Sequence, residues 1–494
     1  MKEKKNWIPS VNQFIDKVKL EDDFKDLDYE IIIRNIKNYI SKINSGEFAS
    51  HCSQNNEIED VDNKKKAILN HFIEYLKKLS SCPIKHVLNA TGVVLHTNLG
   101  RAPMSENAFD FLRKNSLNYL NIEFDLKTGK RAYRDDFLKD IFHFITGSED
   151  VVVVNNNAAA LYLILNTLIP SHQNYSTQSS LSYNQFENKN IKNQVIISRG
   201  ELVEIGGSFR IPDILESSGA VLKEVGTTNC TRLSDYEKAI NENTALILKA
   251  HTSNYTINGY TESVEIDDLV ALSKKYNLPF VYDVGSGLIK KTKSLKYSNE
   301  LTIPEYISKD IDIICFSGDK LLGSSQAGII LGKGCYLNQF KKNPLMRVLR
   351  ADKFTISNLY FHISMYKNEN ELLLNNKVYN ILSQSEDELK EKALLLSNSL
   401  NKYCIKNKIN EVSAFTGGGS MPDLKLKSYE VCLDIETQKT KDEDLYHRLL
   451  LLDTPIVTVL RERKLFINIY TIEKEDIEYI AKSINLIIQN SIST

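Results

Sequence analysis

Residues 311–332 read IDIICFSGDKLLGSSQAGIILG, and this stretch predicts the core of the fold. Its two ends have the length and β-branched content of buried strands, and Lys320 lies between them. A lysine is unusual there, because its long cationic side chain normally reaches water. One interpretation is a surface lysine in a tight turn. The other is a lysine that binds pyridoxal phosphate covalently, since burial lowers the amine pKa and makes the neutral nucleophile available.

A second segment, residues 150–161 (DVVVVNNNAAAL), points to a phosphate ligand. A four-valine strand runs into three asparagines and then into an alanine-rich helix. The first N–H groups of such a helix, with the helix dipole behind them, bind phosphate well, and small alanines let it approach. We therefore expect Asn156, Asn157 and Ala158, together with Ser317 beside the lysine, at a cofactor phosphate. An asparagine that only caps the helix is the alternative.

Two further predicted strands end in polar residues that suit a cofactor. Asp283 ends the strand in FVYDVGSG (280–287), and His251 follows the strand in ALILKAHTSNY (245–255). Ligands of open α/β sheets gather at the carboxyl ends of strands. Asp283 is suited to hold a pyridine nitrogen protonated, and His251 to lie over the ring. The alternatives are a helix-capping aspartate and a hydrogen-bonded structural histidine.

Three arginines are candidates for an anion site. Arg101 follows a segment whose glycines and polar groups interrupt an apolar strand, which indicates a loop held against a functional site. Arg347 and Arg350 belong to a cluster of five cations in residues 341–353 and share one face if that segment is helical. A guanidinium group binds anions bidentately. Surface salt bridges and a solvated basic face are the alternatives.

The alternation of short apolar runs, glycines and helical stretches predicts an α/β fold with a mainly parallel central sheet. We expect a large domain over residues 81–365 and a small α+β domain over residues 366–494. Residues 171–194 are polar and lack apolar periodicity, which indicates an inserted loop. Residues 1–80 read as amphipathic helices with unevenly distributed charge. Such a helical domain suits RNA binding, a dimerisation arm or a packing cap.

Composition is that of an ordinary soluble protein: of 494 residues, 42% are hydrophobic and 25% charged, with a formal net charge of -1. Near-neutral charge excludes a generally basic nucleic-acid coat but not a local basic patch. The seven cysteines are scattered, so neither a zinc pattern nor a disulfide framework is present, and a reducing compartment fits best. The sequence has no signal peptide and no membrane-spanning apolar stretch. We expect a cytoplasmic protein with no metal and no membrane contact.

Several segments resemble one family, the bacterial selenocysteine synthases or L-seryl-tRNA(Sec) selenium transferases. The longest and most specific are HTNLGR (96–101) and SRGELVEIGGSFRIP (198–212). The others are NATG (89–92), NNNAAA (155–160), VGTTN (225–229), HTSNY (251–255), DVGSG (283–287) and the stretch around Lys320. The similarity extends from about residue 8 to the C-terminus.

The resemblance implies a fold-type-I pyridoxal-phosphate enzyme that converts seryl-tRNA(Sec) to selenocysteinyl-tRNA(Sec). Lys320 would bind the cofactor and release it to the serine amino group. Loss of the β-hydroxyl would give aminoacrylyl-tRNA, to which selenium from selenophosphate adds. Arg101, Arg347 and Arg350 match family positions for selenophosphate, and Asp319 matches an acidic neighbour that assists proton transfer. The family also implies a tRNA-binding N-terminal domain and a homodecamer, a pentamer of dimers.

Two features depart from the family pattern. Residues 323–326 read GSSQ where the family usually has Gly-Gly-Pro-Gln, which bears on the rigidity of the lysine loop, and the 171–194 insertion is not typical. The nearest alternative function is a related pyridoxal-phosphate lyase or transferase that acts on a small free amino acid, although such relatives generally lack the N-terminal domain. A non-catalytic RNA-binding or scaffold protein is more distant, because it does not require Lys320, Asp283 and the Asn156 turn together.

Overall fold

The computed structural model describes residues 7–47, 61–169, 192–206, 209–292, 295, 300–422, 424–435 and 441–492. The chain separates into two compact units, Met1–His86 and Val87–Thr494. Each unit has its own hydrophobic core. Most of the loop expected at residues 171–194 lies outside the described residues, and its last residue, Gln194, begins a strand.

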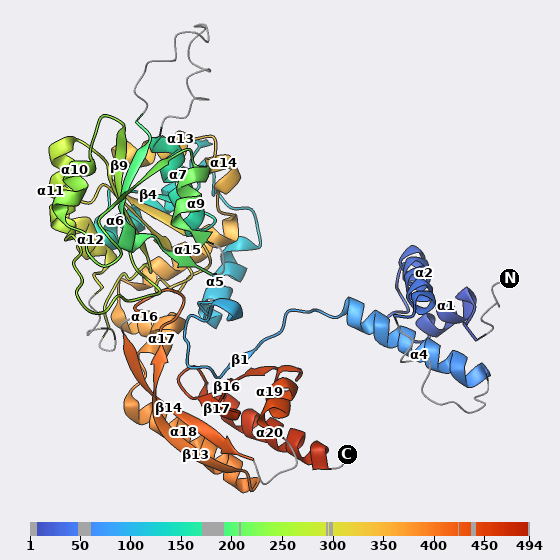
Figure 1. Ribbon diagram of the computed structural model, residues 1–494. Coiled ribbons are helices and arrows are strands. Elements are labelled where there is room, and N and C mark those ends of the chain that lie inside the picture. The colour runs from blue at the N-terminus through green and yellow to red at the C-terminus, as the bar shows by residue number, and fades with distance from the viewer. Residues whose placement is uncertain are drawn as a thin grey trace. The chain divides into compact units, whose positions relative to one another are not determined.

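The first unit contains helices α1 (Val11–Lys19), α2 (Tyr29–Ser45) and α4 (Val61–Ser80) (Figure 1). Apolar residues at helical spacing bring one buried ring from each helix together in the core. These are Phe14, Tyr39 and Phe72, whose ring centroids lie between 4.9 and 6.0 Å apart. The polar faces of the helices remain exposed.

The second unit is built on a seven-stranded sheet in the order β4-β12-β11-β10-β9-β5-β8. In that order the strands are β4 (Asp150–Val154), β12 (Gly328–Gly332), β11 (Ile313–Ser317), β10 (Phe280–Gly285), β9 (Thr244–Ala250), β5 (Gln194–Ser198) and β8 (Val221–Val225). All neighbours are parallel except β12, which is antiparallel to β11 and β4. The connection between β11 and β12 carries Lys320 and is short. It therefore requires antiparallel pairing of these two strands, because parallel neighbours need a longer crossover. The mainly parallel α/β sheet expected from the sequence is confirmed.

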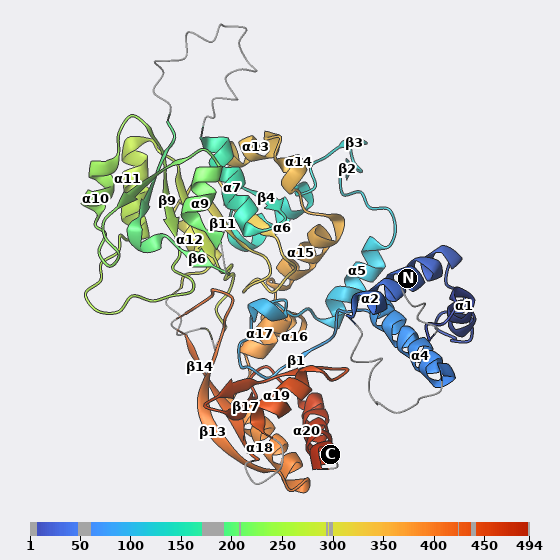
Figure 2. The same ribbon diagram turned by 45° about the vertical axis from the view of Figure 1, so that its right-hand side comes forward.

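Helices cover both faces of this sheet (Figures 1 and 2). Side chains alternate along each strand, so Val151 and Val153 face one core while Val152 and Val154 face the other. The first core includes α6 (Asp136–Thr146), α11 (Ile266–Tyr276), α12 (Ile303–Ser308) and α15 (Lys353–Met365). The second includes α7 (Asn157–Leu168), α9 (Ile211–Ser217) and α13 (Gly334–Lys342).

The C-terminal part of this unit contains an antiparallel sheet in the order β13-β14-β17-β16. Its strands are β13 (Lys406–Phe415), β14 (Lys425–Asp434), β16 (Val459–Arg461) and β17 (Lys464–Asn468). Helices α18 (Glu386–Lys402), α19 (Asp442–Leu450) and α20 (Ile477–Ile492) belong to the same part, and α18 packs on β13 and β14 (Figure 2). Strand β1 (Leu88–Asn89) pairs in parallel with β15 (Ile456–Val457), so the segment that enters the second unit adjoins the C-terminal part.

The remaining elements are short, except for the 11-residue helix α5. They are α5 (Glu106–Ser116), α10 (Leu233–Ala239), α14 (Met346–Leu349), α16 (Glu369–Asn375), α17 (Lys377–Leu382), β2 (Phe124–Asp125), β3 (Lys130–Arg131), β6 (Glu204–Ile205), β7 (Phe209–Arg210), and the 3₁₀ turns Thr97–Leu99, Arg199–Glu201 and Lys474–Asp476. Among the described residues, no helix is both long and apolar enough to cross a membrane.

The expectation that Arg347 and Arg350 share one helical face is wrong. Helix α14 ends at Leu349, and Arg350 is extended, with φ -61° and ψ 140°. Strand β4 lies at the edge of the sheet, where its backbone groups are free to pair with another segment. Arg350 forms an antiparallel bridge with Val154 there, which ends the helix.

Candidate active site

The lysine turn, residues 318–327, connects β11 to β12 and presents Lys320 at the carboxyl end of β11. The Gly318 N–H donates to the Ala327 carbonyl oxygen at 2.9 Å, which closes the turn. The Leu321 N–H donates to the Ser286 carbonyl oxygen at 3.0 Å, which ties the turn to the end of β10. The lysine backbone is therefore held between two strands of the central sheet.

Tyr366 and Asn376 hold the lysine turn from outside the sheet. Tyr366 Oη donates to the carbonyl oxygens of Leu321 and Leu322, at 3.3 and 3.1 Å. Asn376 Nδ2 donates to the Leu322 carbonyl oxygen at 2.9 Å, while its Oδ1 accepts the first N–H groups of α17. Gly323 has φ +76°, and a Cβ there would lie 2.3 Å from Asn376 Oδ1. Only glycine fits this position without displacing the asparagine.

Lys320 is buried, with 5% of its surface exposed. No residue that the structure describes forms a hydrogen bond or ion pair with its Nζ. Glycine backbone flanks the amine, because an added Cβ at Gly285 or at Gly419 would lie 3.7 Å from Nζ. Burial lowers the pKa of Lys320, and the negative charge of Asp283 opposes this only in part. The amine is therefore both enclosed and available to react.

Asp283 lies at the end of β10 and is connected to the start of α7. Asn157 Nδ2 donates to Asp283 Oδ1 at 2.8 Å. Asn156 is the N-cap of α7, and its Oδ1 accepts the Ala159 N–H at 2.8 Å. Burial raises the pKa of Asp283, while the hydrogen bond from Asn157 and the charge of Lys320 oppose the rise. The His251 N–H donates to the Asp283 carbonyl oxygen at 2.9 Å, so His251 lies directly beside this strand end.

Arg101 reaches the lysine turn from the N-terminal side of the second unit. Its Nη1 donates to Asp319 Oδ2 at 2.8 Å, next to Lys320 in the chain. Its backbone has φ +61°, a left-handed conformation that a non-glycine residue seldom adopts. Its Nε is buried and has no hydrogen-bond partner among the described residues. The guanidinium group thus retains donor capacity for an anion.

One cavity of about 260 Å³ brings most of the expected site residues together. Its lining includes Arg101, Asn156, Asn157, Ala158, His251, Asp283, Ser317, Asp319 and Lys320. It also includes Ser253 and Gln326, to which the sequence interpretation assigned no role. Gly419, close to Lys320 Nζ, was likewise missed. Three successive glycines at 417–419 were the available signal, since such a run marks close backbone approach.

Arg347 and Arg350 line a different cavity of about 470 Å³, together with Glu123, Arg131 and Arg134. Arg350 Nη1 pairs with Glu123 Oε1 at 3.0 Å, and Arg134 Nε pairs with the same oxygen at 2.5 Å. The hydrogen bond from Arg134 is the main reason that the pKa of Glu123 is lowered. The expected anion site is therefore divided in the single chain, with Arg101 in one cavity and the other two arginines in another.

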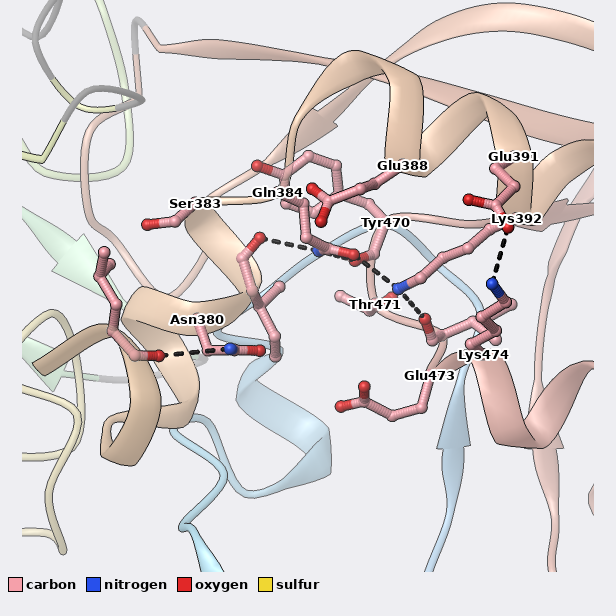
Figure 3. Close-up of a pocket in the computed structure, with 13 residues that line it drawn as sticks. Asn380, Ser383, Gln384, Glu388, Glu391, Lys392, Tyr470, Thr471, Glu473 and Lys474 are labelled. Carbon is pink, nitrogen blue, oxygen red and sulfur yellow. Dashed lines mark hydrogen bonds and ion pairs between the residues drawn. The ribbon is translucent and has the colours of Figure 1, made fainter. Parts of the chain in front are cut away.

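A third cavity, of about 370 Å³, lies between α17, α18 and residues 470–474 (Figure 3). Lys392 Nζ donates to Gln384 Oε1 at 2.6 Å and to the Ile472 carbonyl oxygen at 2.8 Å. Lys474 pairs with Glu391 at 2.7 Å on the same side (Figure 3). These contacts join α18 to the segment after β17, so the polar groups of this cavity have a structural role.

The residues of the Lys320 cavity fit pyridoxal phosphate. Lys320 supplies a buried amine without a hydrogen-bond partner in the described chain, and Asp283 supplies a carboxylate for a ring nitrogen. Asn157 Oδ1 is also buried without a hydrogen-bond partner among the described residues. The N-terminus of α7 adds helix N–H groups suited to a phosphate. An amine, a carboxylate and hydrogen-bond donors suited to a phosphate therefore line one cavity.

Comparison with known proteins gives the family of this chain. The sequence model of the family described as SelA, L-seryl-tRNA selenium transferase, matches residues 87–181 and 186–473. The L-seryl-tRNA(Sec) selenium transferase of Aquifex aeolicus is 42% identical over 434 residues, covering 86% of this chain and 90% of the relative. That of Alkaliphilus oremlandii is 36% identical over 490 residues and covers 98% of both chains.

Among solved structures, a D-glucosaminate-6-phosphate ammonia-lyase has a similar fold, with a TM-score of 0.59 and 15% identity. The match covers 85% of this chain and 99% of the lyase. At this identity the likeness concerns the α/β fold alone. The sequence matches decide the family, since they are far more similar and cover most of both chains. The chain belongs to the L-seryl-tRNA(Sec) selenium transferase family.

Proposed function

We propose that this chain converts seryl-tRNA(Sec) to selenocysteinyl-tRNA(Sec), with selenophosphate as selenium donor and pyridoxal phosphate as cofactor at Lys320. The observation that carries the proposal is the buried Lys320 amine, which has no ion-pair partner in the described chain and shares a cavity with Asp283 and the start of α7. Membership of the family supports the substrate, because the relatives are named for selenium transfer to L-seryl-tRNA(Sec).

The site residues expected from the sequence and found in this cavity each have a role in this proposal. When bound, pyridoxal phosphate supplies an electron sink for the serine α-carbon. Lys320 binds the cofactor and accepts the α-proton, since burial keeps its amine neutral at a lower pH than usual. Asp283 would accept a hydrogen bond from the ring N–H, and His251 would lie over the ring. The phosphate would be held by Asn156, Asn157, Ala158 and Ser317.

The proposed anion site begins with Arg101 and Asp319. Arg101 binds the selenium donor through its remaining N–H groups, and Asp319 holds the guanidinium group in place while assisting proton transfer. Arg347 and Arg350 stay candidates for the same anion. Because they line another cavity in the single chain, their proposed role does not include contact with Lys320 of their own chain.

We also propose that residues 1–80 bind the tRNA and that the protein forms a homodecamer, a pentamer of dimers. Exposed cations on the first unit, including Lys66 and Lys78, support the first proposal. Lys66→Glu with Lys78→Glu should weaken seryl-tRNA binding about tenfold at low salt without changing cofactor binding. Exposed apolar side chains such as Leu117 and Tyr119 support self-association. Analytical ultracentrifugation tests whether ten copies assemble.

The decisive experiment incubates the purified chain and pyridoxal phosphate with seryl-tRNA(Sec) and labelled selenophosphate. We expect labelled selenocysteinyl-tRNA(Sec), and none from the Lys320→Ala variant. Free serine is the parallel substrate. Turnover of free serine alone, with no change in the aminoacyl-tRNA, would identify an amino-acid lyase instead.

A further inference from the structure

Glu300 is a buried carboxylic acid next to the lysine turn that no sequence motif singled out. It precedes α12, and its side chain is 3% exposed. Burying a carboxyl group costs folding free energy unless neighbouring groups form hydrogen bonds or ion pairs with it. Its neighbours therefore indicate what it does.

Two of these neighbours, Ser286 and His251, belong to segments close to Lys320. Ser286 Oγ donates a hydrogen bond to Glu300 Oε1, and the Ser286 carbonyl oxygen accepts the N–H of Leu321, which follows Lys320. Glu300 Oε2 lies 3.7 Å from His251 Nε2. The carboxyl group thus lies beside the residues that follow β9 and β10. His251 lines the Lys320 cavity, and Ser286 directly follows Gly285, which also lines it.

Burial makes Glu300 titrate near neutral pH, against the groups that face it. Burial raises the pKa of Glu300 to about 7, while the Ser286 hydrogen bond and the charges of Lys320 and Lys291 oppose the rise. Besides His251 from the segment after β9, the phenols of Tyr282, Tyr306 and Tyr379 face it from β10, α12 and α17. These tyrosines are uncharged at neutral pH, because burial raises the pKa of each.

We propose that Glu300 is a positioning residue that holds the His251 ring and controls its protonation, with Ser286 orienting the carboxyl group. A carboxylate beside Nε2 favours a proton on that nitrogen and stabilises the imidazolium form. Protonation of Glu300 removes this preference. The proposal rests on the proposed cofactor site, since His251 acts there only if its ring lies over pyridoxal phosphate.

The test is a pH titration of the full-length protein with bound pyridoxal phosphate, followed by visible absorption between about pH 5.5 and 9. We expect a spectral transition near pH 7 that Glu300→Gln abolishes. Ser286→Ala should move its midpoint to higher pH, because that serine lowers the pKa of Glu300. Glu216→Gln, an exposed acid on α9, is the control and should leave the titration unchanged. A wild-type titration retained in Glu300→Gln overturns the proposal.

Kinetics in two backgrounds separate positioning from a general structural effect. Glu300→Gln should lower kcat for selenium transfer about ten- to a hundredfold with little change in KM for seryl-tRNA(Sec). In a His251→Gln background the same substitution should cost almost nothing more, because the group that it positions is gone. A full additional loss in that background contradicts the proposal. A wild type that binds no pyridoxal phosphate instead contradicts the proposed function, before Glu300 is tested.

Discussion

Lys320 is buried and Lys392 is half-buried, and the two lysines differ in what their amines bind. Burial is the main reason that the pKa is lowered in both. Lys392 Nζ donates to Gln384 and to the Ile472 carbonyl oxygen (Figure 3), whereas no described residue bonds to Lys320 Nζ. The Lys392 amine joins two segments of the C-terminal part. The Lys320 amine forms no hydrogen bond with the described residues and keeps its full bonding capacity.

The difference shows that desolvation alone does not mark a reactive lysine. A lowered pKa arises wherever a cation is buried without a full counter-charge. The informative observation is the unused bonding capacity of Lys320 in a cavity that also contains Asp283 and Arg101. In Lys392 the same electrostatic feature accompanies satisfied hydrogen bonds, which indicates a structural role.

The largest contrast should come from removing each lysine. Lys320→Ala should abolish the visible absorption of bound pyridoxal phosphate and lower selenium transfer on the order of a thousandfold or more. Lys392→Met should retain both, since its hydrogen bonds serve only local packing. Absorption spectra and transfer assays of the two purified variants make the comparison. Equal loss in both variants would contradict the distinction.

Asp283→Asn should separate function from stability in the Lys320 cavity. We expect selenium transfer to fall about a hundredfold, since the ring nitrogen loses its carboxylate. The cofactor-free variant should melt about 1–2 °C higher at pH 7, because burial raises the pKa of Asp283 and its charged form destabilises the fold.

The pH dependence of stability shows whether the Asp283 carboxylate destabilises the cofactor-free protein. The destabilisation by Asp283 is present above its folded pKa and vanishes below the ordinary value of 3.8, where the group is protonated in both states. The difference in Tm between wild type and Asp283→Asn should therefore shrink as pH falls. A difference that grows on acidification would mean that the carboxylate stabilises the cofactor-free protein. Calorimetry at several pH values decides between these outcomes.

The framework behind Lys320 should respond less strongly than its charged groups. Asn376→Ala removes both the hydrogen bond to Leu322 and the N-cap of α17, and should cost about 2 kcal/mol of unfolding free energy. Asn380→Ala, in the same helix but exposed, is the matched control. Denaturant unfolding measures both variants. If Asn376→Ala costs no more than the control, the clamp on the lysine turn is not significant.

The smallest effect is expected at Ser324, where this chain departs from the family's usual glycine. Asn358 Nδ2 donates to Ser324 Oγ at 3.3 Å and also contacts Met104 Sδ. Loss of the serine hydroxyl therefore leaves the Asn358 Nδ2 group with its contact to Met104. Ser324→Gly should cost less than about 1 kcal/mol and leave cofactor binding unchanged. Thermal unfolding of the variant beside wild type provides the measurement. A loss of cofactor affinity would show that this serine stiffens the lysine turn.

Local sequence patterns determined the parts of the molecule that depend on local chemistry. Runs of β-branched residues identify strands such as β4 and β11, and the shortness of the connection after β11 requires a hairpin there. Lys320, Asp283 and Asn156 were recognisable because each lies at or just after the end of a buried strand, and strand ends of an α/β sheet converge on one edge. The family motifs gave these positions their expected chemistry.

Only the tertiary structure decided the contacts between residues far apart in the chain. Gly419 approaches Lys320 from the C-terminal part, Asn376 holds the lysine turn, and Glu300 lies beside His251. The separation of Arg347 from the Lys320 cavity also depends on how distant segments pack. Periodicity and turn chemistry report on neighbours within a few residues, whereas packing selects partners by shape and burial across the whole fold.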